Sequence, residues 1–253
     1  DISKLYPPIS FPVCLGTPMI GSLVKWDHSA TWDVPDNKHK SERWSGEHVV
    51  EINLSTETDA YLAGHKIDGR IIFPGAGLAL MVWKTFAKLR NTDFERLPII
   101  FENLWFQRIT IIPEKKTIKF LVSILEGTGD FTVHEAGMVV FSGNIRVAES
   151  IEKDWLDLPP LPMSPVEKGI LLLNTEDVYK ELWLRGYEYN GIFKGIKYCD
   201  SNVTIGKIHW FNEWSSYMDN MFQFKLLASD RELVYVSKIR YAAIDPVSHK
   251  RRY

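Results

Sequence analysis

The sequence predicts an α+β fold of two lobes, each with a central helix wrapped by an antiparallel sheet. Two stretches, 75–89 and 214–228, have a helical pattern, and strand-like alternation of apolar and polar residues lies on both sides of each. Between them, residues 158–165 contain four prolines, which cannot lie inside a sheet. We therefore place an inter-lobe linker at 158–165, a first lobe at 45–157 and a second lobe at 166–253.

The composition fits a globular protein and argues against several functions. The chain has 253 residues, 45% of them hydrophobic, which is enough for one large or two small domains. A net charge of −2 without a run of basic residues argues against binding to nucleic acid or to an anionic membrane. No apolar run in the sequence approaches the roughly 20 residues of a membrane span. The two cysteines are far apart and favour a reducing compartment, so we expect a cytoplasmic location.

Residues 1–44 are predicted to form an extended linker. They contain five prolines and show little periodicity, which is typical of a connector rather than of a packed element. The chain begins at Asp1 and carries no charged and apolar leader. We therefore expect it to be a piece of a longer polypeptide.

The first lobe is predicted to begin with a strand at 50–54, where apolar and polar residues alternate. A helix follows at 75–89, because Leu78, Val82, Phe86 and Leu89 recur every three or four positions and form one apolar stripe. Further strands are predicted at 101–112, 117–125 and 139–147, with a turn at 135–137.

The second lobe is predicted to begin with a helix that Asn174 caps and that ends at Gly186. A loop follows at 187–193, then a strand at 203–210, the second central helix at 214–228 and a strand at 233–244. These strands are too few to surround the second helix. We therefore expect the second lobe to be incomplete within this chain.

A histidine lies shortly before the start of the first central helix. Pro74 suits the first turn of that helix, because its missing N–H is not needed there. Gly75 and Gly77 would weaken a helix interior, but at its start they leave backbone N–H groups open to a ligand atom. His65 is thus a potential base beside a potential oxyanion site. The structural alternative is a core histidine, a turn glycine and a proline that opens a helix.

The second central helix carries a carboxyl group within its apolar sequence. Asp219 and Gln223 are four residues apart, so they lie on one face of the helix and within reach of each other. Methionine and aromatic residues flank both of them. The alternative interpretation is an exposed carboxylate with a glutamine neighbour.

Three motifs follow one another along the chain. His65, Gly69 and Pro74 spell HxxxGxxxxP, residues 186–193 read GYEYNGIF, and Asp219 with Gln223 spells DxxxQ. These motifs resemble those of the dehydratase domain in animal-type fatty acid synthases and modular polyketide synthases. The middle motif of that family reads GYxYGPxF, so 190–191 depart from it and we expect the loop to turn differently. Residues 5–8 and 25–35 also resemble the segment that precedes the dehydratase in animal fatty acid synthases. This resemblance favours a multifunctional fatty acid synthase as the parent protein.

The resemblance implies a double hot-dog fold and the dehydration of β-hydroxyacyl thioesters to trans-2-enoyl thioesters. It also implies that His65 is the base, that Asp219 is the acid, and that the substrate pocket includes Gly69, Pro74, Gly75, Tyr189 and Gln223. The domain would need no cofactor of its own, because the substrate is carried on the phosphopantetheine of an acyl carrier domain. The implied partners are that carrier domain, the other domains of the same synthase, and a second copy in a homodimer.

Other chemistries find little support in the sequence. Residues 75–77 form a lone GxG, but Leu80 stands where a dinucleotide-binding fingerprint needs glycine. No GxSxG motif occurs, so we do not expect a serine hydrolase. The seven histidines include no HExxH motif, so we do not expect a metal site. Three alternatives stay open. They are a polyketide synthase dehydratase, a thioesterase-type hot-dog enzyme, and a non-catalytic hot-dog domain that docks partners.

Overall fold

The computed structural model describes residues 47–125, 127–149, 171–229 and 233–252, and the predicted linkers at 1–44 and 158–165 lie outside these ranges. Its strands are β1 (Glu47–Ile52), β2 (Lys66–Ile67), β3 (Arg70–Ile71), β4 (Ile99–Phe106), β5 (Ile118–Ile124), β6 (Asp130–Glu135), β7 (Met138–Val147), β8 (Leu172–Asn174), β9 (Ile196–Asp200), β10 (Gly206–Ile208) and β11 (Lys238–Ile244). Its α-helices are α1 (Gly75–Leu89), α3 (Thr175–Leu184), α4 (Trp214–Leu227) and α5 (Pro246–Arg252). Short 3-10 turns are η4 (Ala60–Gly64), η5 (Phe94–Arg96) and η6 (Gly191–Phe193).

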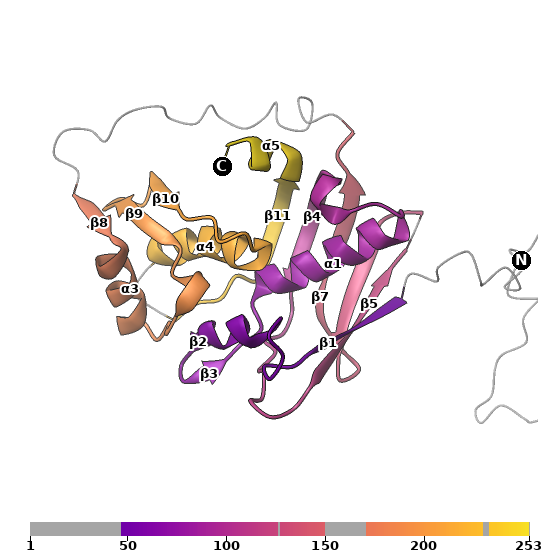
Figure 1. Ribbon diagram of the computed structural model, residues 1–253, viewed down its shortest axis with the longest axis horizontal. Helices are drawn as coiled ribbons and strands as arrows, with labels where there is room; N and C mark the ends of the chain where they lie inside the picture. The colour runs from indigo at the N-terminus through magenta and orange to yellow at the C-terminus, as the bar shows by residue number, and fades with distance from the viewer. Residues whose placement is uncertain (1–46, 126, 150–170, 230–232, 253) are drawn as a thin grey trace, which may run out of the picture. The chain divides into compact units, whose positions relative to one another are not determined.

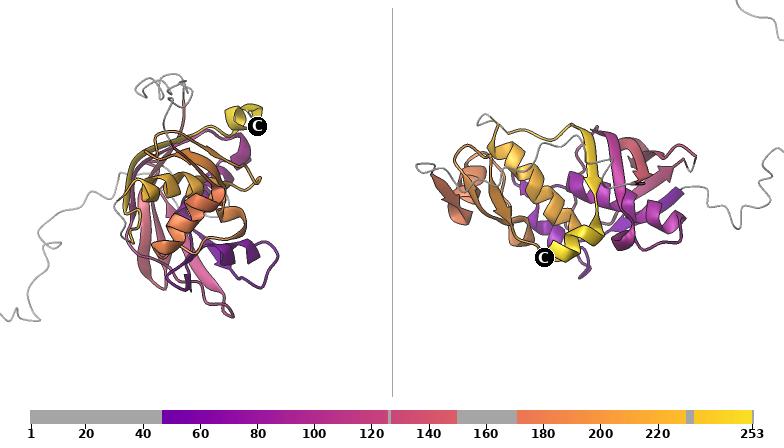
Figure 2. Two further views of the ribbon diagram at one scale, coloured as in Figure 1. Left: turned by 90° about the vertical axis from the view of Figure 1, so that its left-hand side faces the viewer. Right: turned by 90° about the horizontal axis from the view of Figure 1, so that it is seen from above.

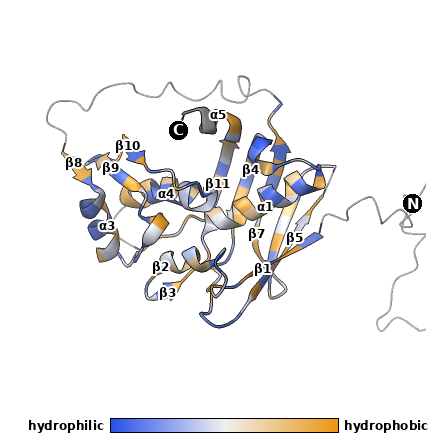
Figure 3. Cartoon of the chain, in the orientation of Figure 1, coloured by the Kyte–Doolittle hydropathy of each residue, from blue (hydrophilic) through white to orange (hydrophobic). Residues whose placement is uncertain are grey.

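Helix α1 lies against one face of a six-stranded sheet, as Figures 1 and 2 show. The strand order is β1-β5-β6-β7-β4-β11, and every neighbouring pair is antiparallel. Alternate residues of β5 are buried, as expected for a strand with one face on a core. Figure 3 shows the same alternation of hydrophobic and hydrophilic residues along the strands. The predicted helix at 75–89 and its surrounding antiparallel sheet are therefore confirmed.

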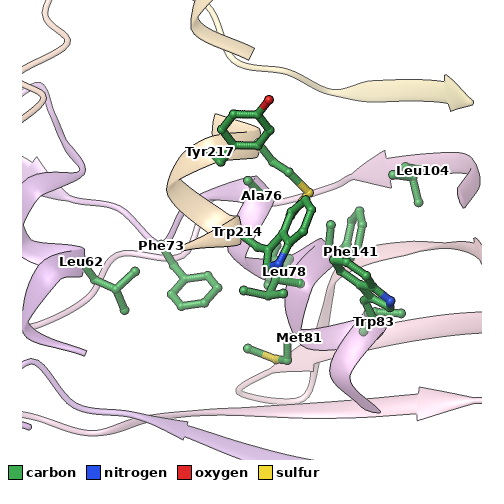
Figure 4. Close-up of a cluster of buried hydrophobic side chains, with 14 of the residues drawn as sticks. Leu62, Phe73, Ala76, Leu78, Met81, Trp83, Leu104, Phe141, Trp214 and Tyr217 are labelled. Atoms are coloured by element: carbon green, nitrogen blue, oxygen red, sulfur yellow. The ribbon is translucent and has the colours of Figure 1, made fainter. Parts of the chain in front are cut away.

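Helix α4 packs against α1 and against a second, three-stranded sheet of order β10-β9-β8. The indole rings of Trp83 on α1 and Trp214 on α4 meet edge to face, with centroids 5.2 Å apart. Figure 4 shows both within the buried hydrophobic cluster. The Trp83 indole N–H donates to the carbonyl oxygen of Leu97 at 3.1 Å, so the ring is buried without an unpaired donor. Both central helices lie inside the protein, as predicted.

Strand β11 follows α4 in the chain but pairs with β4 in the sheet that covers α1. Residues assigned to the second lobe thus extend the sheet of the first. The periodicity of residues 233–244 predicted a strand without indicating its neighbour, because alternation reports only which face is buried.

The strand predicted at 233–244 begins only at Lys238, as β11. Two further predicted strands are markedly shorter in the structure, because other hydrogen bonds compete with the ladder. The strand predicted at 101–112 ends at Phe106, because Ile112 N–H donates to Ile71 O at 2.8 Å and Phe73 N–H donates to Thr110 O at 2.8 Å. Residues 110–112 therefore leave the sheet and pair with the segment that follows His65.

The strand predicted at 203–210 shrinks to β10. The Asp200 carboxylate accepts from the N–H groups of Thr204 and Ile205 at 2.7 and 2.6 Å, which folds these residues into a turn. Strands β2, β3, β6, β8 and β9 and helix α5 were not predicted. The cap on α3 is confirmed, because the Asn174 side chain accepts from Asp177 N–H and the Asp177 side chain accepts from Asn174 N–H.

No helix in the described ranges is long and apolar enough to cross a lipid bilayer.

Candidate active site

His65 lies between η4 and β2, and its imidazole is buried, with 4% of the residue exposed. Its Nδ1 lies 2.7 Å from the carbonyl oxygen of Ile72, and Ile72 N–H donates to the His65 carbonyl at 3.0 Å. Because a carbonyl oxygen can only accept, Nδ1 must carry the hydrogen. In the neutral ring Nε2 then keeps its lone pair, as a base requires.

The first motif builds the frame that holds this histidine. Asp68 and Gly69 have positive φ angles of 49° and 73° and form the two-residue turn between β2 and β3. This turn brings Ile72 back beside His65. Gly69 itself is exposed at the hairpin tip, where its N–H donates to a carboxylate oxygen of Glu188 at 2.8 Å. Gly69 therefore serves the conformation of the turn, and it does not line the cavity described below.

Pro74 and Gly77 also serve the frame. Pro74 is the N-cap of α1, and its carbonyl accepts from Gly77 N–H at 2.9 Å. The Gly77 N–H is consequently not open to a ligand, and our prediction of an open donor at that position is wrong. Gly75, at the first position of the helix, lines the cavity, and the N–H of a first helical residue has no carbonyl of its own helix to accept it.

Asp219 on α4 meets His65 inside the protein. The Asp219 Oδ1 atom lies 3.4 Å from His65 Nε2, and the side chains are 7% and 5% exposed. The two residues are 154 positions apart and come from different predicted lobes. The exposed-carboxylate interpretation of Asp219 is therefore wrong.

Gln223 holds the other oxygen of this carboxyl group. Its Nε2 donates to Asp219 Oδ2 at 3.0 Å and to the Phe193 carbonyl at 3.0 Å. Its Oε1 accepts from the Tyr179 hydroxyl at 2.9 Å. Gln223 thus orients Asp219 from behind and does not line the cavity.

Tyr189 lies over the histidine, with ring centroids 5.3 Å apart. Burial, and then the nearby Asp219 carboxyl, raises the pKa of the Tyr189 hydroxyl well above its usual value, so the hydroxyl keeps its proton at neutral pH. Phe193 packs its ring against the histidine from another side, at 5.1 Å. The imidazole is thereby held between aromatic rings.

The departure at 190–191 changes how the loop turns, as predicted. Gly191 has φ +57°, which proline cannot adopt because its ring fixes φ near −65°. The Asn190 side chain caps this turn by accepting from Gly191 N–H at 2.8 Å. Asn190 N–H also donates to Gly64 O at 2.8 Å, one residue before His65.

Asn220, which the sequence analysis missed, fixes the end of this loop. Its Oδ1 accepts from Gly195 N–H at 3.1 Å, and its Nδ2 donates to Ile192 O at 3.3 Å. Asn220 and Gln223 are three residues apart on α4, and both are fully buried. The recurrence of polar residues at helical spacing within this apolar helix was the signal that could have identified it.

Gly195→Ala is expected to destabilise the protein by about 1–3 kcal/mol, because overpacking a tight site forces neighbouring groups to move. A Cβ atom at this position would collide with the Asn220 amide, which is fully buried. Chemical denaturation measures the change. Gly127→Ala is the matched control, because nothing lies within 4 Å of a Cβ there. Equal stability of the two variants would contradict the tight packing of the loop on α4.

One cavity joins the residues described above. His65, Gly75, Tyr189 and Asp219 line it together, and the rest of its lining is mostly apolar. Its volume is about 90 Å³, which holds several water molecules or a short piece of an acyl chain. Within the described ranges, no three histidine, cysteine or acidic side chains are grouped as metal ligands would be. The cavity therefore offers a base, a carboxyl group and an apolar wall at one place.

Comparisons with known proteins point to one class of domain. Residues 37–136 match a family model described as the polyketide synthase dehydratase domain. The hybrid PKS-NRPS synthetase poxE of Penicillium oxalicum is 28% identical in an alignment of 187 residues that covers 68% of this chain and 4% of that protein. The chain thus spans a small part of a large synthase to which it is similar.

Solved structures of dehydratase domains share the hot-dog fold of this chain. The dehydratase domain from the CurF module of the curacin polyketide synthase gives a TM-score of 0.58 at 17% identity, over 77% of this chain and 76% of that one. The dehydratase domain of PpsC from Mycobacterium tuberculosis, in complex with C12:1-CoA, gives a TM-score of 0.53 at 15% identity. The match covers 70% of this chain and 66% of that one. The predicted fold class is therefore confirmed.

Proposed function

We propose that this domain dehydrates β-hydroxyacyl thioesters to trans-2-enoyl thioesters, with the substrate carried on the phosphopantetheine of an acyl carrier domain. One observation carries the proposal. His65 Nε2, with its lone pair free, faces a carboxyl oxygen of Asp219 at 3.4 Å inside an apolar cavity. Such a pair supplies the base and the acid that the elimination of water requires.

The residues act at named atoms in this reaction. His65 Nε2 removes a proton from Cα of the substrate, while protonated Asp219 donates its proton to the hydroxyl on Cβ, which leaves as water. Negative charge that develops on the thioester oxygen faces the N–H group of Gly75 at the positive end of α1. Transfer of the proton from Nε2 to Oδ1 across 3.4 Å then restores both groups.

A direct assay tests the proposal. The full-length protein is given a 3-hydroxyacyl thioester of phosphopantetheine, and the product is identified by mass spectrometry. We expect an enoyl thioester that has lost one water. Release of the free acid would instead identify a thioesterase-type enzyme. If the correctly folded protein forms no product from a carrier-bound substrate, the non-catalytic docking domain would be favoured.

We further propose that the parent protein is a cytoplasmic, homodimeric fatty acid synthase. The resemblance of 5–8 and 25–35 to the linker of animal fatty acid synthases supports this choice. The family model and poxE support the broader class of multidomain synthases, which a polyketide synthase dehydratase would share. The synthase supplied with acetyl-CoA, malonyl-CoA and NADPH should release a saturated straight-chain acid. A product that keeps keto, hydroxyl or alkene groups would identify a polyketide synthase.

A further inference from the structure

Tyr179, outside all three motifs, reaches the active site through one hydrogen bond. It lies on α3 and is 6% exposed. Its hydroxyl accepts from Ile196 N–H at 3.0 Å and has two acceptors in reach, Gln223 Oε1 at 2.9 Å and Asn220 Oδ1 at 3.3 Å. Burial raises the pKa of this hydroxyl far above its usual value, so it remains a hydrogen-bond donor over the working pH range. The Ile196 N–H occupies a lone pair of the hydroxyl. Of the two acceptors, Gln223 Oε1 is the nearer, and Asn220 Oδ1 already accepts from Gly195 N–H, so the hydroxyl hydrogen points to Gln223.

In the proposed mechanism Asp219 carries a proton, and the orientation of the Gln223 amide decides which carboxyl oxygen holds it. As observed, Nε2 donates to Asp219 Oδ2, so that oxygen accepts a hydrogen bond and the proton belongs on Oδ1. Oδ1 is the oxygen that faces His65. If the amide were turned by half a rotation, Oε1 would face Oδ2 and would hold the proton on Oδ2, away from the reacting atoms.

We infer that Tyr179 is a positioning residue, which holds the Gln223 amide in the orientation that keeps the proton of Asp219 on Oδ1. This inference rests on the proposed dehydratase function and adds a residue to its acid side. Loss of the hydroxyl leaves the buried Gln223 Oε1 without its donor and removes one of the contacts that distinguish the two amide orientations. The defect should therefore affect the step that uses the acid and spare the step that uses the base.

Two substrates separate these steps. The 3-hydroxyacyl thioester loses hydroxide, which needs a proton from Asp219. The 3-chloroacyl thioester loses chloride when His65 takes the Cα proton and the Cβ–Cl bond breaks, and chloride needs no proton. For Tyr179→Phe we expect kcat to fall about tenfold or more on the hydroxy substrate, because small displacements of catalytic groups are costly. On the chloro substrate we expect a change within about twofold, after subtraction of the uncatalysed rate.

Tyr61→Phe is the matched control. Its hydroxyl is also hydrogen-bonded, to the Ser215 hydroxyl at 3.2 Å and not to Asp219 or Gln223. Its ring stacks on Phe193 with centroids 6.1 Å apart, a contact that a phenylalanine keeps. We expect it to leave kcat on both substrates within about twofold. Chemical denaturation of each variant establishes that the assayed protein is folded.

A failure of the dehydratase proposal and a failure of the Tyr179 inference give different results. If the wild-type protein makes no enoyl product, the dehydratase proposal fails. If it is active and Tyr179→Phe loses rate equally on both substrates, or on neither, the positioning role is overturned. Should Tyr179→Phe not fold, Gln223→Met removes the acceptor of the same hydrogen bond. It must then lose rate on the hydroxy substrate and spare the chloro substrate, and equal losses would overturn the inference.

Discussion

Replacement of His65 by alanine should lower the rate of enoyl-thioester formation by about 10²- to 10⁴-fold, the usual contribution of a general base. The other described residues that line the cavity include no second histidine and no lysine. The ring also packs on Tyr189 and Phe193, so some stability is lost with it, but the surrounding backbone pairing does not depend on the side chain. Mass spectrometry should show β-hydroxyacyl species accumulating on the carrier.

His209→Ala is the control for this experiment, because His209 is exposed and lies outside the cavity. It should retain wild-type turnover. Near wild-type enoyl formation by His65→Ala would refute the role of His65 as the base.

Asp219→Asn should lose activity by a comparable factor, about 10²- to 10⁴-fold, while the fold is kept. Asparagine is nearly isosteric, and its side-chain carbonyl can still accept from Gln223 Nε2. An amide, however, cannot release the proton that the departing hydroxyl needs. The measurement is the dehydration assay beside chemical denaturation, in which the free energy of unfolding should change by no more than about 1 kcal/mol, the worth of one hydrogen bond.

The 3-chloroacyl thioester sharpens this test, because its elimination should survive in Asp219→Asn. Asp130→Asn is the control, since Asp130 is an exposed carboxylate on β6. Full activity of Asp219→Asn on the hydroxy substrate would end the assignment of Asp219 as the acid.

The central helices could be predicted closely because their signals are local. The helix at 75–89 has the predicted bounds, since Pro74 opens it and an apolar stripe runs along it. The helix at 214–227 ends one residue before the predicted position. The pairing of β11 with β4 could not be predicted, because it joins segments more than a hundred residues apart and alternation does not identify a partner.

The site residues also fall into those that the sequence could identify and those that it could not. The motif pattern identified His65 and Asp219, and the structure places them side by side. Tyr179 could not be identified, because its value depends on a contact 44 residues away that no spacing rule predicts. Gly77 was misjudged because the sequence does not reveal that a carbonyl three residues earlier takes its N–H.

The edge-to-face contact of Trp83 with Trp214 has a consequence for how this sequence can change. His65 precedes α1 by ten residues and Asp219 is part of α4, so the separation of these two side chains depends on how the two helices meet. Neither indole lines the cavity. A displacement of about 1 Å between catalytic groups can nonetheless cost about a hundredfold in rate. Under the proposed reaction, turnover therefore depends on two rings that lie outside the cavity. We expect a substitution at either indole to lower turnover unless a change at the other restores the spacing of the helices.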